Sequence, residues 1–323
     1  MIGVAASPET VESVESALRE ELAREDAVAG TIAPILGHLL ASETNSLFSE
    51  EIVARVRGML TNVAEQLLGQ LAMAGGETER FEASQEDISA LTAAITANPA
   101  FLGHVHALAV EWQLAERLQS RLALDPVLSP LVQALIASSN ATTADLAMKL
   151  LASQARFGRA QHRMQLPLRE LPGDLLHSAL VAMRTVVGTG AEEDERAAAA
   201  AEAAVRGAYD EAGSRLGLIS RVVMDMGGAA VAALSVEHAG VAIFLSALAI
   251  GSGQDRDVAA LSTHETQATR FALALRAAGL KPDTVKEQFL ALHPDIAPPE
   301  GFERLDADRT AGLLAVSSSY AEA

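Results

Sequence analysis

The chain has 323 residues, no cysteine and a formal net charge of −18. The absence of cysteine excludes disulfide bridges, thiolate metal sites and cysteine nucleophiles. The negative charge disfavours nucleic acids and anionic lipid as partners, because both are repelled by an acidic protein. The first residues lack the positive segment of a signal peptide. Together these features predict a cytoplasmic protein that binds neither nucleic acid nor membrane.

The composition indicates the fold class. Half of the residues are hydrophobic and only 3% are aromatic. The apolar residues recur at spacings of three and four, which is the period of amphipathic helices. Most of the expected helices are joined by short turns, so that consecutive helices would lie antiparallel. We therefore predict an all-α fold of stacked antiparallel helical hairpins, an α-α array of the HEAT-like kind, without a significant sheet.

The amino-terminal section, residues 1–76, is predicted to be acidic and helical. Ser7, which precedes a proline, is typical of a helix start, and a second helix is expected over residues 31–40. The strongest helical pattern covers residues 52–71, where one apolar stripe runs to a pair of glycines. The polar segment 77–83 follows this helix and is predicted to be a hinge.

Residues 84–298 are predicted to form the helical array, and residues 299–323 a weakly ordered tail with one weak helix over 306–315. The array begins at a capped helix and continues with a long helix from Pro99 to Leu122. Shorter helices, some of them broken pairs, are expected over residues 126–138, 141–165, 172–187, 191–226, 228–234, 239–250, 255–261, 265–278 and 282–292.

The most membrane-like part of the chain is residues 226–251. Glu237 and His238 interrupt it and leave 239–250 as the longest clean apolar run, whereas a membrane span needs about 20 residues. We therefore expect buried helices of a soluble protein here.

Short turn and cap motifs stand out in the middle and end of the chain. They are Leu124-Asp125-Pro126-Val127-Leu128, Ala144-Asp145-Leu146, Leu171-Pro172-Gly173-Asp174-Leu175-Leu176 and the segment from Phe244 to Leu280. With these motifs, residues 120–292 resemble an uncharacterised alphaproteobacterial family of helical, HEAT-like domains. The resemblance implies a bacterial protein with an α-α array, and it supplies no catalytic residues.

Recognised catalytic signatures are incomplete in this sequence. The pair His264-Glu265 begins the zinc-protease pattern H-E-x-x-H, but Ala268 stands where the second histidine is required. The Gly-x-Gly sequences lack the third glycine and the preceding strand of a dinucleotide loop. None of the three lysines follows a glycine, as a phosphate-binding Walker loop requires. We therefore predict no enzymatic activity and no cofactor or metal.

Histidines and acidic residues supply a second kind of candidate. His104 and His106 are expected on a helix surface or at a cap. Glu237 and His238 have two interpretations, a junction between two apolar helices or a buried functional pair. In the second interpretation, they would line a pocket between helices together with Asp225.

A basic stripe is the most suggestive feature. Residues 101–190 carry a net charge of +2, whereas the segments on either side are acidic. The candidate residues for binding a protein partner or an anion are Lys149, Arg156, Arg159, Arg163 and Arg169. The first four are spaced by seven, three and four, so they share one helical face. The alternative is that they neutralise acidic faces of the same chain and, near the helix end, complement its dipole.

These features favour a protein-interaction, adaptor or regulatory module that binds a protein partner through a helical surface. The alternative is a ligand sensor or a small-molecule or metal-dependent enzyme with a pocket between helices. A DNA-binding regulator is disfavoured, because the second helix of the pair over residues 265–292 presents Asp283 and Glu287, which do not form a basic surface. A homodimer stays open, since the alanine-rich residues 197–204 permit close helix packing.

Overall fold

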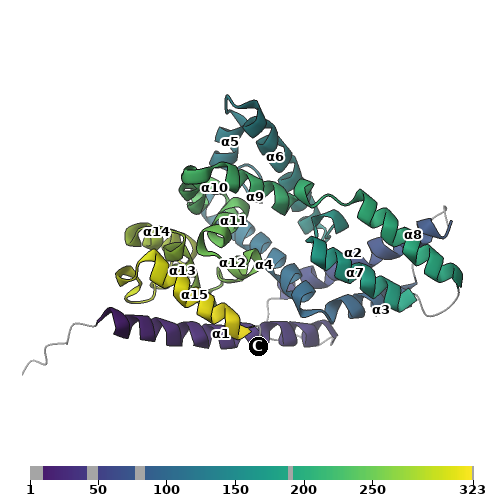
Figure 1. Cartoon of the computed structure of the whole chain (residues 1–323), viewed down its shortest axis with the longest axis horizontal. Coiled ribbons are helices and arrows are strands. Elements are labelled where there is room, and N and C mark those ends of the chain that lie inside the picture. The colour runs from purple at the N-terminus through teal and green to yellow at the C-terminus, as the bar shows by residue number, and fades with distance from the viewer. Residues whose placement is uncertain (1–9, 42–49, 77–83, 188–191, 322–323) are drawn as a thin grey trace, which may run out of the picture. The chain divides into compact units, whose positions relative to one another are not determined.

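The computed structural model describes residues 10–41, 50–76, 84–187 and 192–321 of the chain (Figure 1). In these ranges every regular element is an α-helix or a short 3-10 helix, and no residue lies in a strand. The predicted all-α class is therefore confirmed. The finer expectation of a HEAT-like array stays a prediction.

The chain forms two compact units, which we call the central unit, Ile32–Asp225, and the terminal unit, Met1–Thr31 with Met226–Ala323. This division differs from the predicted sections. The segment 77–83, predicted as a hinge, lies outside the described residues, and the helices before and after it pack against each other within the central unit. The residues predicted as one array, 84–298, are divided between the two units at Met226.

Helix α2 (Glu50–Ala74) corresponds to the strongest helical pattern of the sequence, and it supplies much of the core of the central unit. Its apolar stripe includes Val56, Met59, Val63 and Leu67, which have no exposed surface. The helices that pack against it are α3 (Gln85–Thr96), α4 (Pro99–Leu122), α7 (Gly173–Val187) and α8 (Glu192–Ala208). This cover on several sides explains why the stripe is buried from Ile52 to Leu67.

Helix α4 has the predicted bounds and the expected end signals. The side chain of Asn98 accepts two backbone N–H groups of the first turn, and Ala123 ends the helix in the left-handed conformation. His104 and His106 are buried, at 2% and 5% exposure. Their predicted place on a helix surface or at a cap is wrong, because α4 packs against α2, α3 and α6 (Ala141–His162).

The remaining helices of the central unit are shorter. They are α5 (Pro130–Ile136), η1 (Leu168–Glu170), η2 (Glu211–Gly213) and α9 (Arg215–Asp225). Both α5 and α9 pack against α6. The sequence predicted one helix or a broken pair over residues 191–226. The structure has a broken pair, because η2 and a turn separate α8 from α9.

The terminal unit begins with the first part of helix α1 (Val11–Ala41). Ser7, the predicted cap, lies outside the described residues, and Thr10 accepts the backbone N–H of Ser13 at 3.2 Å instead. The sequence predicted two helices here, but α1 is continuous. Pro34 is tolerated inside it because a proline removes only one hydrogen bond of a long helix.

The remaining described helices of the terminal unit are η3 (Gly227–Leu234), α10 (Val236–Ala239), α11 (Val241–Ser252), α12 (Arg256–Leu261), η4 (Glu265–Gln267), α13 (Ala268–Ala277), α14 (Pro282–Leu292), η5 (Phe302–Arg304) and α15 (Ala307–Ala321). The core joins α11, α13 and α14 through their aromatic rings. The ring of Phe271 lies 6.3 Å from that of Phe244 and 6.0 Å from that of Phe289. Helix α11 is buried almost throughout, as predicted.

The described part of the carboxy-terminal section, residues 299–321, contains more helix than predicted. The expected helix is present as α15, and it extends to Ala321. It packs against α13 and buries Leu313 and Leu314, while Phe302 of η5 is also buried. These two adjacent leucines and the phenylalanine anchor this part of the chain on the core of the terminal unit.

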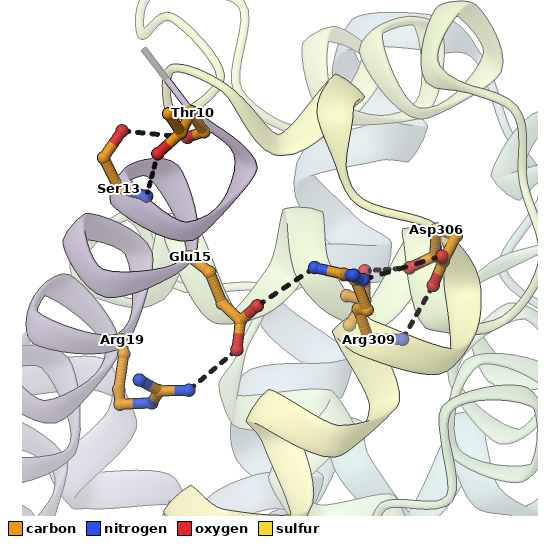
Figure 2. A network of polar contacts seen from close by, with 7 residues as sticks. Thr10, Ser13, Glu15, Arg19, Asp306 and Arg309 are labelled. Atoms are coloured by element: carbon orange, nitrogen blue, oxygen red, sulfur yellow. Dashed lines mark hydrogen bonds and ion pairs between the residues drawn. The ribbon is translucent and has the colours of Figure 1, made fainter.

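Polar contacts also hold α15 within the terminal unit. Figure 2 shows the guanidinium group of Arg309 between the carboxylates of Asp306 and Glu15, at 3.9 and 3.6 Å. Glu15 of α1 also pairs with Arg19 at 2.8 Å. All four side chains reach solvent, so these pairs contribute little stability and mainly fix the local geometry.

In the ranges that the structure describes, no single helix combines the length and the apolar character needed to cross a membrane. Two pairs of consecutive helices, α3 with α4 and α9 with η3, meet the length and composition criteria together, but each pair is sharply bent at a short break.

Candidate functional site

Helix α6 carries the predicted basic stripe. Its start is fixed by Asn140, whose side-chain oxygen accepts the N–H groups of the first turn. It ends at His162, and Met164 follows in the left-handed region with φ 54°. Leu146, Leu150 and Phe157 face inward and are buried. The opposite face of the helix is therefore presented to solvent, as the helical period predicted.

The structure leaves all five predicted basic residues exposed. Two of them have partners on their own chain. Lys149 pairs with Asp145 one turn away at 2.7 Å, and Arg169 lies near the buried carboxylate of Glu170 at 3.6 Å. For these two residues, the alternative of internal neutralisation holds.

The other three arginines of the stripe form what we call the arginine face: Arg156, Arg159 and Arg163. None of them makes an ion pair with any residue that the structure describes. Arg159 donates only to the carbonyl oxygen of Ala155 on its own helix, at 3.3 Å. Spacings of three and four place the three guanidinium groups on one side of α6. Ion pairing within the described chain therefore does not account for these three charges, while Arg159 in the last turn of α6 and Arg163 at its C-cap also complement the helix dipole, as the alternative expected.

Small and flexible apolar groups accompany the arginine face. Met148 is 50% exposed, and Ala152, one turn further along α6, is exposed as well. Ala152 lies one helical turn before Arg156, and Met148 lies one turn before Ala152. The solvent side of α6 therefore combines cations with an apolar strip, and methionine adapts readily to the shape of a partner.

A buried ion pair holds α6 in place. The guanidinium group of Arg215 at the start of α9 donates to both oxygens of Glu111 on α4, at 2.6 and 3.1 Å. It also lies over the ring of Phe157 of α6, 3.6 Å from the centroid, and donates to the side-chain oxygen of Gln154 at 3.4 Å. The Phe157 ring meets Trp112 of α4 edge-on. These contacts tie α4, α6 and α9 together.

Sequence reasoning missed this pair. It gave no role to Arg215, which lies 104 positions beyond Glu111 in the chain. The available signal was a lone glutamate among buried residues of α4, since such a charge requires a partner. Both carboxylate oxygens of Glu111 are engaged with Arg215, so this pair is a structural element of the central unit.

The residues of the predicted pocket lie at the junction between the two apolar segments. Glu237 and His238 belong to the four-residue helix α10, between η3 and α11. Glu237 is exposed and His238 is half-buried, so the expected buried pair is not formed. The carboxylate of Asp225, at the end of α9, is also exposed. The junction interpretation agrees with this placement.

A pocket of a size suited to a small molecule is present in each unit. The pocket of the central unit measures 340 Å³ and that of the terminal unit 480 Å³. The first is lined by Gln66, Gln70, Pro167, Leu168, Arg169, Leu176, Ala204, Val205, Ala208 and Tyr209. The second is lined by Ala17, Leu18, Glu21, Glu25, Glu265, Thr266, Ala268, Thr269, Ala297, Pro299 and Glu300. Of these residues, the sequence had singled out only Arg169 as a binding residue.

Glu25 in the second pocket has a structural role. Its two carboxylate oxygens accept the backbone N–H groups of Thr269 and Arg270 at 2.8 and 2.9 Å, at the start of α13. Asp26 beside it pairs with the guanidinium group of Arg270. Burial raises the pKa of the Glu25 carboxyl above its ordinary value, although the two N–H groups act in the opposite direction.

Over the described ranges, no group of three or more histidine, aspartate or glutamate side chains has an arrangement that would hold a metal ion. The comparisons with known proteins find no match among protein-family models, curated proteins or solved structures. The resemblance to an alphaproteobacterial helical family stays a prediction.

Proposed function

We propose that the chain is a protein-interaction module, and that the arginine face of α6 binds an acidic segment of a partner protein. The observation that carries the proposal is that Arg156, Arg159 and Arg163 are exposed and make no ion pair with any described residue, in a protein of net charge −18. Other exposed arginines, such as Arg184 and Arg206, pair with glutamate.

Free guanidinium groups suit a carboxylate-bearing partner. A guanidinium group binds a carboxylate through two parallel hydrogen bonds, which adds geometric selectivity to the attraction. The acidic remainder of the protein repels acidic segments everywhere else, so such a partner would be directed to this face. The arrangement therefore favours one orientation of the complex.

Charge alone would give a weak complex. Exposed ion pairs contribute about 0.2–1 kcal/mol each, so three of them supply at most ~3 kcal/mol, whereas a micromolar complex requires about 8 kcal/mol. The apolar strip of Met148 and Ala152 offers the additional contact. We therefore infer that the partner segment is an amphipathic acidic helix, with apolar side chains one turn apart and carboxylates beside them.

Fluorescence anisotropy with a labelled helical peptide of this design, carrying glutamate and leucine at helical spacing, tests the proposal. We expect the variant Arg156→Gln/Arg159→Gln/Arg163→Gln to bind the peptide at least about fivefold more weakly than the wild type, which corresponds to ~1 kcal/mol. Binding by the wild type should also weaken as salt is raised from 50 to 300 mM, roughly in step with screening.

A matched control removes the same charge elsewhere on the central unit. Arg121, Arg196 and Arg221 are also exposed and make no ion pair with a described residue, and they lie on α4, α8 and α9. The variant Arg121→Gln/Arg196→Gln/Arg221→Gln should bind the peptide within about twofold of the wild type. Equal weakening by the two triple variants would show that net charge, and not the arginine face, attracts the peptide.

A further inference from the structure

Helix α8 presents carboxylates to solvent at its amino-terminal end. Its first turn contains four consecutive acidic residues, and all four are exposed. Glu192 and Glu195, which belong to this turn, make no ion pair with any residue that the structure describes. The helix packs against α2 and α7, and it buries Ala198 and Ala201. The acidic turn therefore has no basic group of its own unit to neutralise these two carboxylates.

Small apolar side chains follow the carboxylates on the same helix. Ala199 and Ala203 are exposed and lie one and two helical turns beyond Glu195. With spacings of three, four and four residues, these positions fall within an arc of roughly 80°. Alanine side chains also permit a short distance between two packed helix axes. We call this surface the α8 stripe, and its residues are Glu192, Glu195, Ala199 and Ala203.

The solvent side of α6 has the same spacings in the reverse order. Its apolar strip and the first two cations of the arginine face are separated by four, four and three residues. Both helices rise by about 1.5 Å per residue, so in an antiparallel pair equal spacings stay in register. In one such register the facing residues are Met148 with Ala203, Ala152 with Ala199, Arg156 with Glu195 and Arg159 with Glu192.

Both surfaces face solvent in the single chain, and α6 and α8 lie apart in the central unit (Figure 1). A contact between them therefore needs two molecules. We propose that the α8 stripe of one copy of the chain binds the arginine face and apolar strip of a second copy, a pairing that rests on the proposed function of that face. Each guanidinium group meets a carboxylate, and each apolar side chain meets an alanine.

The net charge of −18 on each copy opposes this association at long range. At about 150 mM salt, charges more than ~8 Å apart are largely screened, whereas ion pairs in contact are screened less. Arg196, at one edge of the α8 stripe, lowers the negative charge there. The contact is also small, so the expected dissociation constant is on the order of 100 μM.

Sedimentation equilibrium of the full chain at about 150 mM salt, over roughly 5–500 μM, tests the pairing. The average mass of the wild type should rise with concentration above the monomer value of 33.7 kDa. The variants Arg156→Glu/Arg159→Glu and Glu192→Arg/Glu195→Arg should each lose this rise, because each places like charges opposite one another. A wild type that stays at 33.7 kDa over the whole range would overturn the proposal.

An equimolar mixture of the two charge-reversed variants should regain the rise in mass. In the mixed pair, the acidic α6 of one variant faces the basic α8 of the other, and the two unaltered surfaces also match. Recovery on mixing excludes loss of folding as the reason that each variant alone is monomeric. If the wild type associates but the mixture does not, other surfaces hold the copies together and the proposal is wrong.

A control variant changes the net charge by the same amount elsewhere on the central unit. Glu65 on α2 and Glu86 on α3 are exposed and make no ion pair with a described residue. Glu65→Arg/Glu86→Arg should associate at least as strongly as the wild type, because it reduces the repulsion between copies. Loss of association in this control as well would contradict a specific role of the α8 stripe.

The peptide experiment fails independently of this one. Glu192→Arg/Glu195→Arg keeps the arginine face, so below the concentration at which copies associate it should bind the designed acidic peptide at least as tightly as the wild type. Peptide binding by a wild type that stays monomeric refutes self-association alone. Association that follows the charge swap, without peptide binding, refutes the acidic partner helix alone.

Discussion

Arg215 carries a positive charge in the interior of the central unit, where its side chain is 1% exposed. Removing a charge from water is costly, and the cost is offset here by the two bonds to Glu111, by the oxygen of Gln154 and by the ring of Phe157. The backbone N–H of Arg215 also donates to the carboxylate of Glu170 at 2.9 Å. The pair therefore fixes the approach of α9 to α4 and α6.

We predict that Glu111→Gln lowers the free energy of unfolding of the central unit by about 3–5 kcal/mol, because it leaves the guanidinium group of Arg215 buried without a counter-charge. The double variant Glu111→Leu/Arg215→Met removes both charges and fills similar volume, so it should be more stable than either single substitution. Urea unfolding followed by circular dichroism at pH 7 measures both effects. If the double variant lost as much free energy of unfolding as the two single variants together, the two charges would not be coupled.

The residues of the candidate site differ in whether their positions could be predicted from the sequence. Spacing along one helix was sufficient to place Arg156, Arg159 and Arg163 on one exposed face, because the period of a helix is local. The pairing of Glu111 with Arg215 was beyond such reasoning, because it joins residues more than a hundred positions apart through the tertiary fold. The lining of the pocket in the central unit was beyond it for the same reason, because its residues come from four separate segments of the chain.

At the scale of elements, the start of α13 depends on a carboxylate from another helix. The first N–H groups of a helix lack partners within it, and Glu25 of α1 supplies acceptors for two of them. Burial nevertheless raises the pKa of Glu25 above the ordinary value of 4.5. The stability that this raised pKa confers is fully present below about pH 4.5, where Glu25 is protonated in both states, and it is lost as the pH rises through the folded-state pKa.

We therefore predict a pH-dependent difference between the wild type and Glu25→Gln. Glutamine does not ionise. The free energy of unfolding of Glu25→Gln should therefore increase relative to that of the wild type as the pH rises from 4.5 to 7. Urea unfolding at several pH values measures the difference, in which the titration of other carboxylates cancels. Glu20→Gln, at an exposed position of the same helix, controls for the loss of one charge. A difference that falls with rising pH would mean that the two N–H bonds outweigh burial.

The elements themselves were predictable to different degrees. Helices with complete apolar stripes and caps, such as α2 and α4, match the expectation closely, because local and tertiary signals agree. The continuous α1 was predicted as two helices, the second of them over residues 31–40, and Pro34 lies inside that second segment, so it does not mark the predicted break. η3 was expected to be buried, but Val231 is 55% exposed. A run of alanine and glycine has high hydropathy but little side chain to bury.

For the molecule as a whole, the excess of acidic residues is the dominant electrostatic feature. The 42 acidic residues exceed the 24 lysines and arginines, so pairing cannot compensate every carboxylate. Several ion pairs in the described ranges link residues one helical turn apart at the surface, such as Arg19 with Glu15 and Lys149 with Asp145. Such pairs contribute about 0–1 kcal/mol each to the free energy of unfolding. Screening of these pairs by salt can therefore lower that free energy only by a small amount. Repulsion between unpaired carboxylates acts over longer distances and opposes folding.

We accordingly predict that salt stabilises the protein. At 20 mM salt the carboxylates repel one another over more than 10 Å, whereas at 500 mM this range falls below about 10 Å, so the midpoint of thermal unfolding should rise by roughly 2–5 °C. Differential scanning calorimetry at constant pH measures the shift. The two triple arginine-to-glutamine variants each remove three positive charges and so increase the excess of negative charge, so both should show a larger rise than the wild type, and by a similar amount. If salt lowered the midpoint instead, the internal ion pairs would outweigh the repulsion. The positive charges of the arginine face would then belong to a surface on which attraction between opposite charges exceeds the repulsion between carboxylates.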